Sequence, residues 1–177
     1  MSGQSFEVPP MSRANIRRLA KQVRASLGVT EARFPIVEYM EIYDQIDKDF
    51  VYDIRTTKEM GTNHGITYPD KKLMLIREDV YNGAAEGKPR DRMTIAHEFG
   101  HLHMHANLGL SRQLPRGKIL TYRSSEWQAN CFGGELLVSA DHAPQCSDPI
   151  EAMQVFGVSW EAANIQWEAF KREGIVK

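Results

Sequence analysis

The first part of the chain has the apolar spacing of a helix. Four apolar residues recur three or four positions apart among basic side chains: Ile16, Leu19, Val23 and Leu27. This pattern predicts a basic amphipathic helix that ends near Gly28. Its basic face either is solvated or contacts a nucleic acid or a partner. The ten residues at the start carry no comparable pattern and look disordered.

Three short segments in the next part of the chain have the composition of strands. Residues 50–54 are rich in β-branched and aromatic side chains. Residues 65–68 and 72–76 flank Pro69-Asp70-Lys71, which is a turn signal. We therefore expect a small antiparallel or mixed sheet. If a peptide binds as an added strand, residues 66–76 contain the expected edge of this sheet.

The second half of the chain is predicted to be helical. Apolar periodicity indicates four helices, over residues 91–105, 125–138, 149–156 and 160–172. Ser125 and Gln128 have the spacing of a capping box at the start of the second of these helices. The last two helices meet at Gly157, in a turn that resembles a helix-turn-helix.

These elements predict an α+β fold in which a small sheet packs on a long helix. We expect a basic N-terminal helix within residues 1–34, a core within residues 35–145 and a helical C-terminal pair within residues 146–177. At 177 residues the chain is long enough to bury a real hydrophobic core. The 42% hydrophobic and 25% charged content is that of a globular protein.

Charge and hydropathy limit which partners the protein can bind and where in the cell it is expected. The formal net charge of -1 gives no overall attraction to nucleic acid or to an anionic membrane, and residues 160–170 contain no Lys or Arg. Direct nucleic-acid binding is therefore not expected. No apolar run is long enough to span a bilayer, the first residues lack a signal-peptide core, and Cys131 and Cys146 form no disulfide framework. We expect a cytoplasmic protein with both cysteines reduced.

The sequence His97-Glu98-Phe99-Gly100-His101 carries the candidate chemistry. Two histidines four residues apart stand on one face of a helix and can bind one metal ion, whereas Glu98 lies beside that face and can act as a base. Ile95, Phe99, Leu102 and Ala106 form an apolar stripe on the other side. The motif is typical of zinc metallopeptidases. The alternative is a chance match on an amphipathic helix. A further metal ligand elsewhere in the sequence would distinguish a real metal site from such a match.

A third metal ligand is needed, and Glu126 is the candidate. It begins a predicted helix on which Asn130 and Gly133 share its face. Asn130 is placed to accept the second N–H of a ligand histidine, and Gly133 would allow the two helices to lie close together. Glu135 is a rival ligand, but it lies about 180° around the same helix from Glu126.

The other four histidines are less suited to bind the ion. His105 lies about 12 Å along the helix from His97, so we expect it to support a ligand or to end the helix. His103 points away from the metal face, and His64 and His142 are isolated in sequence. These three are expected to be surface or hydrogen-bonded histidines.

Two linked stretches of sequence resemble the ImmA/IrrE family of zinc metallopeptidases. They are RMTIAHEFGHLHMH at residues 92–105 and EWQANCFGGELLV at residues 126–138, and a looser resemblance extends from the mid-30s to about residue 170. It implies a minimal zincin-like fold in which His97, His101 and Glu126 bind Zn²⁺ and Glu98 is the catalytic base. Mn²⁺ or Fe²⁺ could also occupy such a site. Gly133-Gly134 departs from the family, which more often has alanines there.

The resemblance also implies a substrate class. Family peptidases typically cut a helix-turn-helix transcriptional repressor, and some are paired with such a partner as toxin and antitoxin. The predicted function is therefore a zinc-dependent endopeptidase acting on a repressor or antitoxin. The alternative is a zinc-bearing module, or toxin component, that sequesters its partner without cutting it. The presence of Glu98 favours the peptidase, because a pure binding module needs no base beside its metal.

The segment before the Glu126 helix is expected to border the site. Its basic residues, in a connector that covers residues 107–124, are Arg112, Arg116, Lys118 and Arg123. This connector either gates or contacts the substrate, or is a solvated charged loop. Three residues are candidate oxyanion donors: Tyr122, Arg123 and Tyr68. The sequence leaves open the partner, the cleavage site, the oligomeric state and the activating signal.

Overall fold

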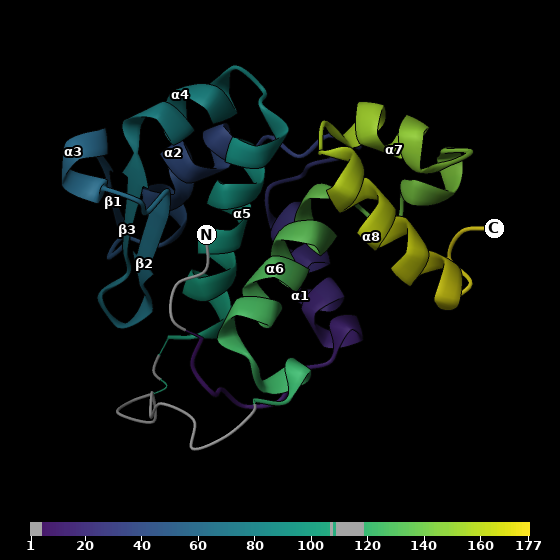
Figure 1. The fold of residues 1–177 in the computed structure, drawn as a ribbon, viewed down its shortest axis with the longest axis horizontal. Coiled ribbons are helices and arrows are strands. Elements are labelled where there is room, and N and C mark those ends of the chain that lie inside the picture. The colour runs from purple at the N-terminus through teal and green to yellow at the C-terminus, as the bar shows by residue number, and fades with distance from the viewer. Residues whose placement is uncertain (1–4, 107, 109–118) are drawn as a thin grey trace.

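A computed structural model describes residues 5–106, 108 and 119–177. Within these residues, the predicted α+β fold is confirmed: a three-stranded mixed sheet is combined with eight α-helices (Figure 1). The helices are α1 (Arg13–Ser26), α2 (Ile36–Ile46), α3 (Thr57–Met60), α4 (Glu78–Ala85), α5 (Pro89–Met104), α6 (Ser125–Leu137), α7 (Pro149–Phe156) and α8 (Trp160–Arg172). The strands are β1 (Val51–Arg55), β2 (Gly65–Tyr68) and β3 (Leu73–Arg77).

The sheet has the order β1-β3-β2, with β3 in the centre. β1 runs parallel to β3 with Val51 opposite Leu73, and β2 runs antiparallel to β3 with Gly65 opposite Ile76. β2 is therefore an edge strand, and it lies beside α5 (Figure 1). The sheet is thus placed so that one free edge runs along the helix that carries the HExxH motif.

α5 and α6 pack together at close range in the middle of the molecule. A Cβ atom added at Gly100 would lie 2.8 Å from the Cα of Ala129, and one at Gly133 would lie 3.4 Å from the backbone nitrogen of His97. Glycine is needed at position 100, where a Cβ would overlap the backbone of Ala129, whereas a Cβ at position 133 would meet backbone at an ordinary contact distance and the Met93 sulfur at 3.0 Å. Gly100 therefore sets how closely the helix with the histidines approaches the helix with Glu126.

The basic helix α1 packs against α6 and uses several of its basic residues inside the molecule. Arg13 and Arg17 form ion pairs with the fully buried side chain of Glu135, at 3.0 and 2.8 Å. Arg24 is buried and donates to the carbonyl of Leu136. Since Glu135 is paired on this side of α6, it faces away from Glu126. The expectation of a solvated basic face is wrong for Arg13, Arg17 and Arg24, because α6 supplies their partners.

The start of the chain pairs with the segment that leads into α6. Phe6 accepts from the backbone N–H of Ser125 and donates to its hydroxyl, while Val8 and Met11 donate to the carbonyls of Arg123 and Tyr122. The expectation that the first ten residues are disordered is therefore wrong for residues 5–10. Their partners lie more than 100 residues away, so no local pattern indicates them. We call residues 5–11 the N-terminal segment.

Two local predictions on α5 and α6 are corrected. The N-cap of α6 is Ser124, whose side chain accepts from the N–H of Trp127. Ser125 bonds instead to the N-terminal segment, and Gln128 turns to other partners, so the predicted Ser125–Gln128 capping box is absent. α5 ends at Met104, so Ala106 lies beyond the helix and does not continue its apolar stripe.

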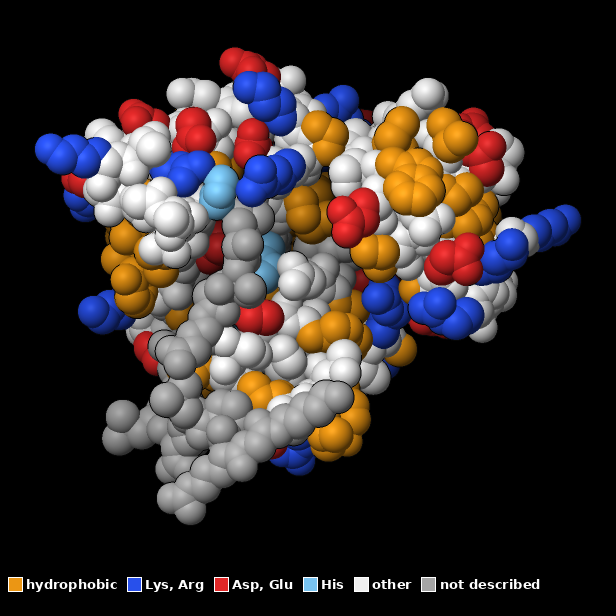
Figure 2. Space-filling model, in the orientation of Figure 1, with side chains coloured by type: hydrophobic (Ala, Val, Ile, Leu, Met, Phe, Trp, Pro, Cys, Tyr) orange, Lys and Arg blue, Asp and Glu red, His pale blue; other side chains and the backbone are white. Residues whose placement is uncertain are grey.

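The hydrophobic core draws residues from all three predicted segments, including Ile16, Phe99 and Phe170. α7 and α8 form the expected C-terminal pair and are joined by Gly157 at a φ of 63°. Exposed hydrophobic side chains gather over this pair (Figure 2): Ile150, Val155, Trp160 and Ile165. Among the described helices, none has the length and hydropathy needed to cross a membrane.

Candidate metal centre

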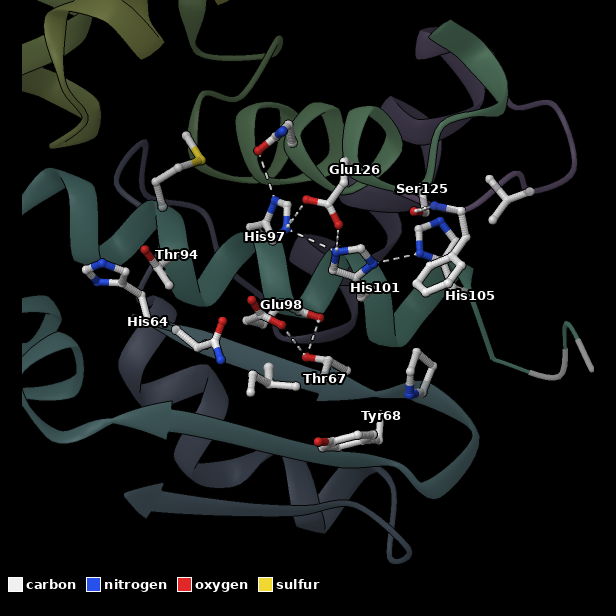
Figure 3. Close-up of a pocket in the computed structure, with 18 of the residues that line it drawn as sticks. His64, Thr67, Tyr68, Thr94, His97, Glu98, His101, His105, Ser125 and Glu126 are labelled. Carbon is white, nitrogen blue, oxygen red and sulfur yellow. Dashed lines mark hydrogen bonds and ion pairs between the residues drawn. The ribbon is translucent and has the colours of Figure 1, made fainter. Parts of the chain in front are cut away.

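Three side chains from α5 and α6 meet at one point. His97 and His101 project from neighbouring turns of α5, and Glu126 projects from the first turn of α6 (Figure 3). The Nε2 atoms of His97 and His101 lie 3.0 Å apart. The carboxylate of Glu126 lies 3.5 Å from Nε2 of His97 and 3.3 Å from Nε2 of His101. The sequence predicted all three residues as metal ligands, and the fold brings them together in a group that could hold a metal ion.

The spacing of these atoms fits a divalent metal ion between them. Ligands bound tetrahedrally at about 2.0 to 2.2 Å from Zn²⁺ are about 3.3 to 3.6 Å apart, which matches the distances from Glu126 to both histidines, while the two Nε2 atoms at 3.0 Å are slightly closer than this. In addition, the buried Oε2 of Glu126 has no hydrogen-bond partner among the described residues. A buried carboxylate oxygen without a donor is costly unless a cation lies against it. The donor set of two imidazoles and one carboxylate suits zinc.

The charges of the cluster are coupled. Burial would raise the pKa of Glu126, but its interactions with His101 and His97 outweigh burial and lower the pKa to about 2. Burial would lower the pKa of His97, but Glu126 and Glu98 together raise it. The carboxylate of Glu126 is therefore ionised at neutral pH and favours a cation beside it.

Each ligand histidine has a partner at its other ring nitrogen. Nδ1 of His97 lies 2.9 Å from Oδ1 of Asn130, as the shared helix face led us to expect. Nδ1 of His101 lies 2.9 Å from Nδ1 of His105, which is also the C-cap of α5. His105 in turn contacts Gln128. Such partners hold imidazole rings in the orientation and tautomer that metal binding requires.

Glu98 is held beside the cluster, outside the group of three candidate ligands. The hydroxyl of Thr67 on β2 donates to Oε2 of Glu98 at 2.7 Å. A Cβ atom at Gly65 would lie 2.7 Å from Cγ of Glu98, so only glycine at that position leaves space for this side chain. Glu98 is 6% exposed, and burial raises its pKa. A carboxyl group with a raised pKa is suited to accept and return a proton.

The cluster lies at the wall of a cavity of about 710 Å³. Histidine and acidic side chains gather in the middle of the face shown in Figure 2, and the close-up in Figure 3 shows how they face β2. Phe6 and Val8 of the N-terminal segment line one part of the cavity, and β2 lines another. The cavity is therefore bounded by a free strand edge and large enough for several residues of an extended peptide.

Of the candidate oxyanion donors, Tyr68 lines the cavity, whereas Tyr122 and Arg123 are not among its lining residues. Arg123 forms an ion pair with Glu7 at 3.1 Å, and the carbonyl of Tyr122 accepts from Gln128. In the connector, Leu108 lines the cavity. Arg112, Arg116 and Lys118 lie outside the described residues.

The remaining histidines differ in their surroundings. His103 lies 2.9 Å from the hydroxyl of Tyr39 and packs on Phe99, and His142 contacts the carbonyl of Thr30, so both are hydrogen-bonded as expected. His64 is also hydrogen-bonded as expected, because its Nδ1 lies 3.0 Å from a guanidinium nitrogen of Arg77, and in addition it lines the cavity. Its position follows from β2, which begins at the next residue.

Zinc is expected to stabilise the folded chain, because the ligands come from two helices and are not preassembled in the unfolded state. At a free zinc concentration 100 times the dissociation constant, the gain is about 2.7 kcal/mol, or about 5 to 10 °C in melting temperature. Thermal unfolding with zinc and with a chelator measures it. Glu126→Ala should lose the shift, whereas Glu168→Ala, an exposed position on α8, should keep it. An undiminished shift in Glu126→Ala would remove Glu126 from the site.

Comparisons with known proteins agree with this geometry. The family model Peptidase_M78, described as the IrrE N-terminal-like domain, matches residues 51–168. No curated protein matches the chain. Among solved structures, the chain is similar to a Mycobacterium tuberculosis transcriptional regulator, with 17% sequence identity and a TM-score of 0.58. The match covers 85% of this chain and 45% of that one, so this chain spans less than half of the regulator's length and shares its fold over that part.

Proposed function

Because the chain belongs to the Peptidase_M78 family, the family of the IrrE N-terminal-like domain, we propose that it is a zinc-dependent endopeptidase. The observation that carries the proposal is the arrangement of His97, His101 and Glu126 around one point, with the carboxylate of Glu98 beside them. These are the groups that a metal-dependent hydrolase needs: three protein ligands and a separate base.

The protein's own residues divide the work of hydrolysis. A zinc ion held by the three ligands would supply Lewis acidity toward water and toward the scissile carbonyl. Glu98 accepts the proton of the attacking water and returns it to the leaving amine, and Thr67 holds its carboxylate in place. Burial of Glu98 excludes bulk water from this proton transfer.

The edge strand β2 is the proposed binding site for the substrate backbone. It lies between β3 and the cavity, and Ile66, Thr67 and Tyr68 all line the cavity. An extended peptide can add to such an edge through main-chain hydrogen bonds, which bind many sequences alike. Side-chain selection then falls to the cavity walls. The substrate would therefore present an extended segment to this edge.

We further propose that the substrate is a helix-turn-helix transcriptional repressor or antitoxin. The support is the resemblance of residues 92–105 and 126–138 to metallopeptidases of the ImmA/IrrE family. An encoded neighbour with a helix-turn-helix is the first protein to test.

The test is to incubate the purified chain with that neighbouring protein, with zinc and after removal of metal by a chelator, and to follow intact mass. The expected result is cleavage at a defined peptide bond that requires zinc and returns when zinc is added back. A stable complex with no cleavage under either condition would contradict the peptidase and favour a module that sequesters its partner. Cleavage at the same rate with zinc and after removal of metal would contradict the proposal that hydrolysis depends on the metal centre.

A further inference from the structure

The orientation of His101 depends on a contact between two ring nitrogens. Its Nε2 faces Glu126, and its Nδ1 lies 2.9 Å from Nδ1 of His105. Two facing nitrogens at this distance share a single proton, so one must donate and the other must accept. Only if His101 donates does its Nε2 carry a lone pair toward the metal. Another residue must therefore decide the direction of this bond.

Gln128 decides the direction through its amide. The Nε2 atom of Gln128 lies 2.9 Å from the carbonyl oxygen of Pro9 and 2.9 Å from that of Tyr122. Carbonyl oxygens only accept, so the NH₂ group of the amide must face them, and its oxygen must face His105. That oxygen lies 3.1 Å from Nε2 of His105 and can only accept there. The neutral ring of His105 therefore carries its proton on Nε2.

The remaining step follows from the two tautomers. With its proton on Nε2, His105 has a bare Nδ1, which accepts from Nδ1–H of His101. His101 then presents an unprotonated Nε2 to the cluster, as metal binding requires. We propose that Gln128 is a positioning residue for the metal centre, which acts through His105 to fix the tautomer of His101. The inference rests on zinc binding by His97, His101 and Glu126, as proposed above.

The contacts of Gln128 are shielded from water and connect distant parts of the chain. Gln128 is 1% exposed and His105 is 4% exposed, so bulk water cannot readily replace either partner. Pro9 belongs to the N-terminal segment, which is hydrogen-bonded to residues 122–125. One of the two carbonyls that orient Gln128 thus comes from the segment whose Phe6 and Val8 line the cavity.

The test is the zinc affinity of the full chain, measured by competition with a chromophoric chelator. Loss of such a supporting contact commonly weakens metal binding by about 10- to 100-fold, which is the effect expected for Gln128→Leu. Gln128→Glu keeps an oxygen that accepts from His105 but makes neither donation of the amide to the carbonyls of Pro9 and Tyr122, so it should recover only part of the lost affinity. If Glu and Leu weaken binding equally, Gln128 only anchors the N-terminal segment, and the positioning role is overturned.

A second measurement needs no variant. In the zinc-loaded wild type, nitrogen-15 NMR of the histidine rings should show His105 protonated on Nε2, and protonation on Nδ1 would overturn the proposal. The two proposals fail in different ways. If the wild type binds no zinc, the proposed function fails and the positioning role fails with it. If the wild type binds zinc and Gln128→Leu binds it equally well, only the positioning role fails.

Discussion

Replacing Glu98 with glutamine is expected to slow peptide hydrolysis by about 10²- to 10⁴-fold while leaving zinc bound. Glu98 is not one of the three residues whose ligand atoms converge, so its amide does not remove a metal ligand. The amide nevertheless cannot accept the proton of water. Its oxygen can still accept from Thr67, which should keep the side chain in place. The measurement is the initial rate of substrate cleavage together with the zinc content of both proteins.

Two controls separate loss of the base from loss of the site. Glu168→Gln changes an exposed glutamate on α8 and should cleave at the wild-type rate. Glu126→Gln should lose activity because it weakens metal binding, so its zinc content should fall. Cleavage by Glu98→Gln at the wild-type rate would show that another group moves the proton.

The second large effect is expected from Gly100→Ala, which should lower the free energy of unfolding by about 1 to 3 kcal/mol. The new methyl group would lie 2.8 Å from the Cα and 3.0 Å from the carbonyl oxygen of Ala129, so α5 and α6 must separate. Because His101 is on one helix and Glu126 on the other, separation should also weaken zinc binding. Urea unfolding and zinc competition measure the two losses.

Gly134→Ala is the matched control for this variant. A Cβ atom at Gly134 would meet the side-chain oxygen of Gln166 at 2.9 Å, and a flexible side chain can move where a backbone cannot. Alanine also has the higher helix propensity, so this variant should stay within about 1 kcal/mol of wild type. Equal destabilisation of the two variants would mean that close packing of α5 on α6 does not determine the effect.

The parts of the fold that depend on local spacing were predictable from the sequence. α7 and α8 begin and end where apolar periodicity and the glycine between them indicate. His97 and His101 are fixed on one face by the period of the helix, and Glu126 could be found because Asn130 and Gly133 repeat on its face. Each of these predictions depends on residues that are close together in the sequence, within a few turns of one helix or at the turn between two consecutive helices.

The parts that depend on distant contacts were not predictable. Ser125 has a good capping pattern in sequence, but Phe6 binds its hydroxyl and Ser124 caps the helix instead. Gln128 looked like the other half of a capping box, whereas its partners are His105 and two backbone carbonyls. Nothing in the sequence indicated that Thr67 holds Glu98, because this contact exists only after β2 lies beside α5.

The pairing of the N-terminal segment also has a consequence for the order of events during synthesis. Phe6 leaves the ribosome 119 residues before its partner Ser125. Until α6 has emerged, the growing chain has neither the carboxylate of Glu126 nor the residues that hold this wall of the cavity. The three residues proposed to bind the metal and this wall of the cavity are therefore completed in the same late step, so the proposed peptidase cannot become active before α6 has been synthesised.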